Sequence, residues 1–366
     1  MNRRLARLKE WMEAERVDAA YIHSPENVFY LTNFLTDPHE RMMGLFLFRE
    51  QPPFFVCPEM ETDQAREAGI SCEMIGYKDH EQPFMLIREA LAKRGLPSIQ
   101  RAAMECELLP YSRAKEFLEI TGSPSVRSAE TILNELRSIK DKSEITIMEK
   151  AAELADYGVE VGAAALKPGV TEMEVLAKIE YELKRKGAKE MSFSTMVLFG
   201  KKSGQPHGNP GNAVLQEGDF VLFDLGVVLD GYCSDITRTV VYGEPDEKQR
   251  LIYETVLKAQ NAALEAAKPG IRIGDLDGIA RDIIRAAGFG SNFPHRLGHG
   301  LGISVHEFPS IAHTNDGVLR EGMTFTIEPG IYVPETGGVR IEDDVFLTAE
   351  GARALTAYPK ELQVIK

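Results

Sequence analysis

Two stretches of the chain, 104 residues apart, are imperfect copies of one another. Residues 214–226 read VLQEGDFVLFDLG and align without gaps on residues 318–330, VLREGMTFTIEPG, so that Asp224 falls on Glu328. A duplicated supersecondary unit folds in the same way in each copy, and we therefore expect a pseudo-twofold axis that brings the two acidic strands together. Facing carboxylates in a protein interior repel each other and lose hydration unless a proton or a cation lies between them. The repeat thus predicts a metal site.

The duplication extends upstream and sets the organisation of the chain. Residues 167–170 (KPGV) are echoed by residues 268–271 (KPGI), so each half is expected to run helix, KPG turn, helix and then paired strands. With 366 residues the chain exceeds what one core usually supports, and two domains are the default. We predict an α/β domain over residues 1–127 and an α+β domain with the internal repeat over residues 128–366.

Local signals in the first domain alternate between helix and strand. Apolar residues at helical spacing and turn residues predict the helices 4–16, 61–68 and 82–94 and the strands 18–22, 44–48 and 53–56. A sequence that resembles a capping box at residues 141–144 opens a long helix that ends near residue 166.

The charge and cysteine content exclude several classes of protein. A formal net charge of −14 argues against a nucleic-acid-binding protein and against affinity for anionic membranes. No apolar run of about 18 residues occurs, so no transmembrane helix is expected. The cysteines are widely spaced, without a CxxC motif, which is typical of reduced thiols in a cytoplasmic protein. They are Cys57, Cys72, Cys106 and Cys233.

Hairpin signals place the acidic residues on common faces. If Asp230 and Gly231 form a two-residue turn, Asp224 lies opposite Thr237, and Asp235 lies on the same face because side chains repeat with period two. In the second copy, strands flank the turn-rich residues 334–338. The same parity places Arg340 and Glu342 on one face, which Glu328 can share.

Histidines complete a candidate ligand set. The glycine-rich sequence around His299 suits a backbone that bends tightly beside a ligand. Four carboxylates and one imidazole form a hard set that suits manganese, with cobalt, iron or zinc as possible substitutes. Five such ligands exceed the needs of one hydrated ion and fit two ions about 3.5–4 Å apart.

With these motifs in order, the chain resembles the pita-bread metallopeptidases, specifically the proline-directed branch that contains aminopeptidase P and prolidase (Xaa-Pro dipeptidase). The resemblance covers nearly the whole chain and includes a creatinase-like N-terminal domain. It rests on residues 26–34 (ENVFYLTNF), 206–208 (PHG), 224–235 with its two acids, 295–302 (HRLGHGLG), 327–330 (IEPG) and 338–343 (GVRIED).

The resemblance implies a role for each matching position. The metal ligands would be Asp224, Asp235, His299, Glu328 and Glu342. Glu328 would also be the general base, and His207 and His306 would contact the scissile group. His295, Arg340 and Tyr332 match positions at or near the substrate. A homodimer and a proline-containing peptide substrate are implied as well.

Several activities remain open at this point. In microbial prolidases of similar length an arginine often follows the HExP motif, but here residues 306–309 (HEFP) precede Ser310. This departure favours a site that admits longer peptides, as in an aminopeptidase, over a strict dipeptidase. The alternatives are a methionine-aminopeptidase-like activity, which the extra N-terminal domain argues against, and a metal-free module that only binds peptides or proteins. The complete ligand set argues against the latter.

Overall fold

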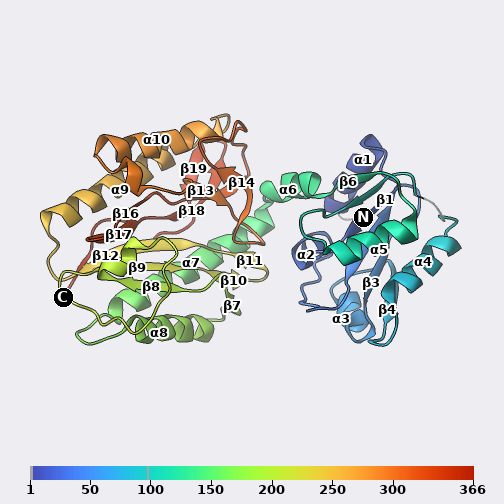
Figure 1. Ribbon diagram of the computed structural model, residues 1–366, viewed down its shortest axis with the longest axis horizontal. Coiled ribbons are helices and arrows are strands. Elements are labelled where there is room, and N and C mark those ends of the chain that lie inside the picture. The colour runs from blue at the N-terminus through green and yellow to red at the C-terminus, as the bar shows by residue number, and fades with distance from the viewer. Residues whose placement is uncertain (1–2, 97–98) are drawn as a thin grey trace. The chain divides into compact units, whose positions relative to one another are not determined.

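The protein is described by a computed structural model over residues 3–96 and 99–366, and the chain forms two compact units (Figure 1). The units are Met1–Arg137 and Ser138–Lys366. The predicted boundary between residues 127 and 128 precedes helix α6 (Glu130–Ser138), whereas the units divide at its end. The end of α6 is hydrogen-bonded to α2 (Pro25–Thr32): Tyr30 donates to the Leu136 carbonyl at 3.0 Å, and Arg137 donates to Asn27 at 2.9 Å.

The N-terminal unit is an α/β domain built on one mixed sheet. The strand order is β4-β3-β2-β1-β5-β6. β1 pairs antiparallel with β2 and parallel with β5, so the sheet contains both kinds of pairing. The strands are β1 (Ala19–Ile22), β2 (Gly44–Phe48), β3 (Phe54–Pro58), β4 (Glu73–Tyr77), β5 (Ala102–Met104) and β6 (Val126–Ser128). The remaining helices are α1 (Arg3–Ala14), α3 (Thr62–Glu67), α4 (Pro83–Lys93) and α5 (Tyr111–Thr121). The predicted strands and helices of this domain are confirmed; the elements that were not predicted are α2, α5, α6, β4, β5 and β6.

The C-terminal unit consists of two similar halves. The first contains α7 (Lys142–Ala164), α8 (Glu172–Arg185), β8 (Met196–Phe199), β9 (Phe220–Leu225) and β12 (Ile236–Tyr242). The second contains α9 (Glu247–Ala266), α10 (Ile273–Ala286), β13 (Gly298–Gly300), β15 (Thr324–Ile327) and β18 (Asp343–Thr348). α7 and α8 pack on the first-half strands through one apolar cluster, and α9 and α10 pack through a second cluster that joins second-half strands with Phe220 of β9 and Val241 of β12. In Figure 1 the strands of this unit lie between α9 and α10 on one side and α8 on the other.

The duplication predicted from the sequence is visible in matching backbone details. Isolated bridges join Thr171 to Val214 and Arg272 to Val318, at corresponding points of the two halves. The glycines of the two KPG turns, Gly169 and Gly270, have φ angles of 82° and 91°, a region that favours glycine. The capping box that opens α7 at Asp141 is confirmed. The expected order of helix, KPG turn, helix and paired strands is therefore confirmed in both halves.

Shorter strands complete the C-terminal unit. They are β7 (Glu190–Met191), β10 (Val227–Leu229), β11 (Tyr232–Cys233), β14 (Glu307–Ile311), β16 (Gly330–Val333), β17 (Gly337–Arg340), β19 (Gly351–Ala354) and β20 (Val364–Ile365). No helix within the described part of the chain has both the length and the apolar character required to cross a membrane.

Candidate metal centre and substrate pocket

The first-half hairpin has the predicted register. Asp230 and Gly231 form the turn with φ angles of 46° and 83°, and Leu229 pairs with Tyr232 across it. Further along, Asp224 on β9 pairs with Thr237 on β12, as predicted. A two-residue turn with two positive φ angles matches the twist of antiparallel strands, which explains why Asp-Gly specifies it.

The second half supplies its acids from equivalent strand ends. Glu328 directly follows β15, and Glu342 directly precedes β18, with Ile327 paired to Asp343 between those strands. His299 lies in β13, which pairs with both β14 and β15. The carboxylates and the imidazole are thus all carried on strand ends of the two halves.

The structure brings three of these groups into one cluster. Asp235, His299 and Glu342 are buried, and each offers a ligand atom within 4.8 Å of the others. His299 Nε2 lies 3.4 Å from Glu328 Oε1 and 3.8 Å from Asp235 Oδ2. Asp224 is also buried, and its Oδ2 accepts a hydrogen bond from Arg340. All five predicted ligand positions are therefore neighbours, although Asp224 is paired with Arg340.

The electrostatics of this cluster suit a cation. Burial, followed by the charges of Glu342 and Asp224, raises the pKa of Asp235 well above its usual value. Burial, with Glu328 and Asp224 next, does the same for the pKa of Glu342. Asp235 Oδ1 and Glu342 Oε1 are buried without a hydrogen-bond partner. Because buried polar atoms are normally satisfied, these oxygens and their mutual repulsion fit divalent ions in this place. The residues present therefore fit the metal that the donor set implies.

His299 is arranged as a neutral ligand. Burial lowers the pKa of its imidazole to about 3, with the neighbouring His306 as the next cause. Its Nδ1 lies 3.1 Å from the Gly300 carbonyl, which leaves Nε2 toward the carboxylates. A carbonyl partner of this kind fixes the tautomer and ring orientation of a metal-binding histidine. The His306 ring lies nearly perpendicular to it, with centroids 4.2 Å apart.

The predicted substrate residues form a second layer beside the acids. His295 Nε2 lies 2.9 Å from the Tyr332 hydroxyl, and Arg340 Nη1 donates to the same hydroxyl at 2.9 Å. Arg340 Nε donates to Thr237 at 3.0 Å. Burial, aided by Arg340, lowers the pKa of His295 to about 4, so its ring is neutral. Tyr332 thus joins His295 to Arg340 within the protein.

These groups surround a cavity of about 700 Å³. Every predicted site residue except Tyr332 lines it. The other lining residues, which the sequence analysis did not single out, are Phe193, Ser194, Met196, Pro206 and Arg296. Arg296 lies directly after His295 in the HRLGHGLG motif, so a basic residue beside the site histidines was the available signal. Among the described residues, the group of Asp235, His299 and Glu342 is the one cluster that could hold a metal ion.

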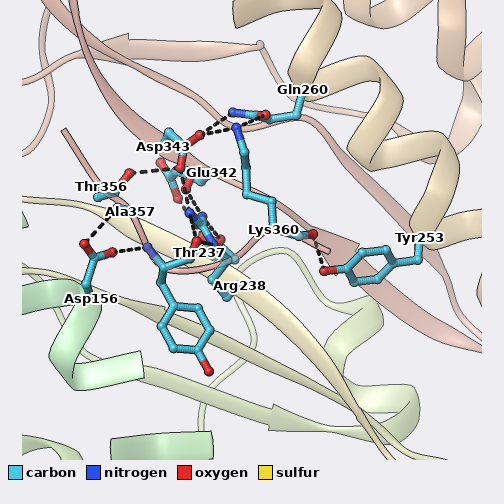
Figure 2. A network of polar contacts seen from close by, with 11 residues as sticks. Asp156, Thr237, Arg238, Tyr253, Gln260, Glu342, Asp343, Thr356, Ala357 and Lys360 are labelled. Atoms are coloured by element: carbon cyan, nitrogen blue, oxygen red, sulfur yellow. Dashed lines mark hydrogen bonds and ion pairs between the residues drawn. The ribbon is translucent and has the colours of Figure 1, made fainter. Parts of the chain in front are cut away.

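A buried polar network supports the backbone beside Glu342 (Figure 2). Arg238 is 1% exposed and donates to Asp343 at 2.7 Å and to the Glu342 carbonyl. Gln260 and Lys360 donate to Asp343 at 2.7 and 2.9 Å. Burial alone would raise the pKa of Asp343, but Arg238 and Lys360 outweigh it and hold that pKa below its usual value. The network therefore anchors Glu342 through the residue that follows it, whereas Arg340 precedes it in the chain.

Comparison with known proteins identifies this arrangement. Residues 146–349 match the family model of metallopeptidase family M24, and residues 4–139 match that of the creatinase/prolidase N-terminal domain. The chain belongs to metallopeptidase family M24. The expected fold, a creatinase-like domain followed by a pita-bread domain, is confirmed, and so is the expected class of enzyme, a metallopeptidase. Members of this family use divalent metal ions, which agrees with the acidic cluster.

Similar proteins match over the whole length. The putative dipeptidase YkvY of Bacillus subtilis (strain 168) is 62% identical over 362 residues, which cover 99% of each chain. The crystal structure of the prolidase from Pyrococcus horikoshii OT3 is similar with a TM-score of 0.90 and 38% identity, covering 99% of this chain and 100% of that one. The Xaa-Pro dipeptidase from Bacillus anthracis is similar with a TM-score of 0.92 and 33% identity, covering 99% of both.

Proposed function

We propose that this M24 peptidase hydrolyses Xaa-Pro dipeptides with two divalent metal ions, most favourably Mn²⁺, although Co²⁺, Zn²⁺ or Fe²⁺ can occupy the same ligands. Asp224, Asp235, His299, Glu328 and Glu342 would hold them. The hard oxygen donors and the crowding of the buried carboxylates support this ligand set. The similar dipeptidase and prolidases support the reaction. The family resemblance supports a homodimer, and the free cysteines support a cytoplasmic location.

The observation that carries the dipeptide specificity is Arg296. Arg296 lines the cavity, and its Nη1 donates to Ser310 Oγ at 3.2 Å. Within the part of the chain that the structure describes, no carboxylate forms an ion pair with it. Ser310 pairs with His299 across β13 and β14, so Arg296 is held next to a metal-ligand strand. A guanidinium in this setting suits a substrate carboxylate, which it can bind through two parallel hydrogen bonds.

The position of Arg296 reverses the substrate preference inferred from the sequence. The missing arginine after HEFP favoured longer peptides, because a dipeptidase needs a cation for the carboxylate of proline. Ser310 occupies that position but hydrogen-bonds Arg296, so a cation reaches the same neighbourhood from a different segment. A longer peptide would present an uncharged amide there. Arg296 therefore favours dipeptides with a free C-terminal carboxylate.

The roles of the other residues follow from their places around the cavity. When bound, the metal ions lower the pKa of a water molecule and polarise the scissile carbonyl. Glu328 takes a proton from the attacking water and returns it to the proline nitrogen as the C–N bond breaks. Without metal ions, burial raises the pKa of Glu328 to about 7. His306 donates a hydrogen bond to the developing oxyanion, and His207 holds the substrate.

The chemistry of proline explains why a dedicated pocket is required. An Xaa-Pro bond is a tertiary amide without an N–H, and the ring fixes φ. The substrate cannot be held by strand pairing across that bond, so its ends and its ring must be recognised. In this proposal Arg296 binds one end, while His295 and Arg340, joined by Tyr332, keep the wall of the pocket rigid.

Replacing Arg296 with methionine tests the dipeptide specificity. Arg296→Met is expected to raise KM for Ala-Pro about 10–100-fold, because a hydrogen-bonded charge contributes about 1.5–3 kcal/mol. Ala-Pro amide, which lacks the carboxylate, serves as the matched substrate, and its kcat/KM is expected to change less than about twofold. Initial rates with purified, metal-loaded protein measure both. Equal losses with the acid and the amide would contradict the proposal.

The same assay separates the remaining alternatives. Cleavage of Ala-Pro-Ala in preference to Ala-Pro would indicate an aminopeptidase, and cleavage of Met-Ala peptides would indicate methionine-aminopeptidase-like activity. Elemental analysis after manganese loading is expected to give about two ions per chain. A ratio near zero would indicate a metal-free binding module.

A further inference from the structure

His207 depends on its loop for its position. The residue belongs to a loop segment over residues 200–210, which begins after β8 with a short 3-10 helix (Gly200–Gly204) and ends before Gly211. The side chain is exposed and lines the cavity. None of the described residues forms a hydrogen bond with its ring. The position of this imidazole is therefore determined by the backbone of the loop.

A single buried carboxylate joins the two ends of this loop. Glu172 is the first residue of α8 and is completely buried. Its Oε1 accepts a hydrogen bond from the Phe199 N–H at 2.9 Å, and its Oε2 accepts one from the Gly211 N–H at 2.7 Å. Phe199 directly precedes the loop, and Gly211 directly follows it. The carboxylate thus holds both ends of the loop at the start of α8.

A lysine of the loop completes this anchor. Lys202 Nζ donates to Glu172 Oε2 at 2.6 Å, and the carboxylate is buried whereas the lysine is 28% exposed. A buried carboxylate is stable only when its oxygens are satisfied by donors or a counter-ion, and Glu172 has both. A Cβ on Gly211 would lie 3.3 Å from Lys202 Nζ, so glycine leaves room for the ammonium group.

The repeated fold does not require this carboxylate. The bridges of Thr171 and Arg272 are equivalent in the two halves, and α8 and α10 each begin at the next residue. In the second half that next residue is Ile273, which is 1% exposed. A helix of the same type therefore starts at the same point without an acid. The anchor is specific to the half that carries the His207 loop.

We propose that Glu172 and Lys202 are positioning residues that fix the loop of His207 at its two ends and so hold that imidazole in the substrate cavity. The inference rests on the substrate role of His207 proposed above. Near the tip, Arg340 Nη1 donates to the Pro206 carbonyl at 3.3 Å, so the loop is also held from the side of the metal centre. Between these anchors, the Gly338 N–H donates to Ser203 Oγ at 2.8 Å, so the loop is held at its ends, in its first half and near its tip.

The adjacent lysine provides a matched control. Lys201 forms an ion pair with Glu335 at 2.8 Å, but the side chains of this pair are 70% and 82% exposed. Such surface pairs contribute little because water and salt screen them. Lys201→Met and Lys202→Met therefore remove the same charge from neighbouring positions, and they differ in whether the anchor is lost.

Lys202→Met is expected to lower kcat/KM for Ala-Pro about tenfold or more, since small displacements of a group that contacts the substrate have effects of this size. Lys201→Met is expected to change kcat/KM less than about twofold, and Lys202→Arg, which keeps the charge, should retain most activity. Glu172→Gln should resemble Lys202→Met or exceed it, because one amide cannot accept all three hydrogen bonds. Bound manganese per chain should remain as in the unchanged protein, since no metal-ligand position is altered.

Combination with His207→Ala distinguishes positioning from a general structural effect. If Lys202 acts through His207, adding Lys202→Met to His207→Ala should lower kcat/KM less than about twofold further. Full additivity of the two losses, or activity of Lys202→Met equal to that of Lys201→Met, would overturn the inference while leaving the role of His207 intact. Undiminished activity of His207→Ala would instead overturn the role of His207 in the proposed function.

Discussion

Asp235→Asn is expected to reduce kcat with Ala-Pro by about 10³-fold or more in the presence of added Mn²⁺, because metal ions supply several kcal/mol of transition-state stabilisation. Asp235 lies in the cluster with His299 and Glu342, and one of its oxygens has no hydrogen-bond partner. Loss of this carboxylate removes one of the five proposed metal ligands. Near-normal turnover of this variant, or of Glu328→Gln, would overturn the assignment of the metal centre.

The same substitution is expected to stabilise the metal-free protein. Burial, followed by the charges of Glu342, Asp224, Asp344 and Glu328, acts against ionisation of Asp235, so a side chain that cannot ionise avoids this cost of folding. The melting temperature of metal-free Asp235→Asn should rise, by about 2–4 °C for each kcal/mol gained. The increase in melting temperature that Mn²⁺ gives the unchanged protein should be largely lost, since this increase reports binding to the folded state. Differential scanning calorimetry with and without Mn²⁺ measures both effects.

A control for this variant lies in the same hairpin. Asp230 is exposed in the turn with a φ angle of 46°, and asparagine tolerates this backbone region well. Asp230→Asn removes the same charge five positions away and is expected to leave both turnover and melting temperature unchanged. If the melting temperature of Asp230→Asn rises equally, the effect of Asp235→Asn comes from net charge and not from the cluster.

The hairpin that carries Asp224 and Asp235 could be predicted because its determinants are local. Asp230 and Gly231 adopt the positive φ angles that a two-residue turn needs, and period-two alternation then fixes the partner of Asp224. The internal repeat extended this reasoning to Glu328. Sequence therefore predicted the acids of the site, since strand register is set by neighbours in the chain.

Residues whose role depends on distant partners were not predictable in this way. Arg296 reaches Ser310 because β14 returns beside β13, a pairing with a register shift after His299. Glu172 reads in the sequence as an ordinary acid in the first turn of a helix capped by Thr171. Only the folded chain brings Phe199 and Gly211 to its carboxylate.

The run of acids after Arg340 shows the same limit. Because side chains alternate along a strand, Asp343 is expected on the face opposite to Glu342 and Asp344. This alternation does not show what each side chain contacts. In the structure Asp343 faces Arg238, while Asp344 Oδ2 accepts a hydrogen bond from the Asp235 N–H at 2.9 Å. The three adjacent carboxylates therefore have three different surroundings, all of them buried.

Arg238→Met is expected to lower the free energy of unfolding by about 3–5 kcal/mol, because it leaves the buried carboxylate of Asp343 without its closest counter-ion. The Arg238 and Asp343 side chains are each 1% exposed, and the pair lies at the centre of the network in Figure 2. Lys360 and Gln260 remain as donors to Asp343, so the variant should still fold. Urea denaturation of the metal-free protein measures the loss.

The double variant Arg238→Met, Asp343→Asn tests whether the reduced compensation of the Asp343 charge causes that loss. Asparagine keeps an oxygen that can accept from Lys360 or Gln260 and removes the charge, so the double variant should be more stable than Arg238→Met alone. Arg238 also donates to the carbonyls of Thr237 and Glu342, which belong to different halves of the repeat. Both single and double variants should therefore bind Mn²⁺ more weakly than the unchanged protein, even where stability is regained. Recovery of stability together with full metal affinity would show that the charge pair serves folding alone and that Arg238 does not position Glu342.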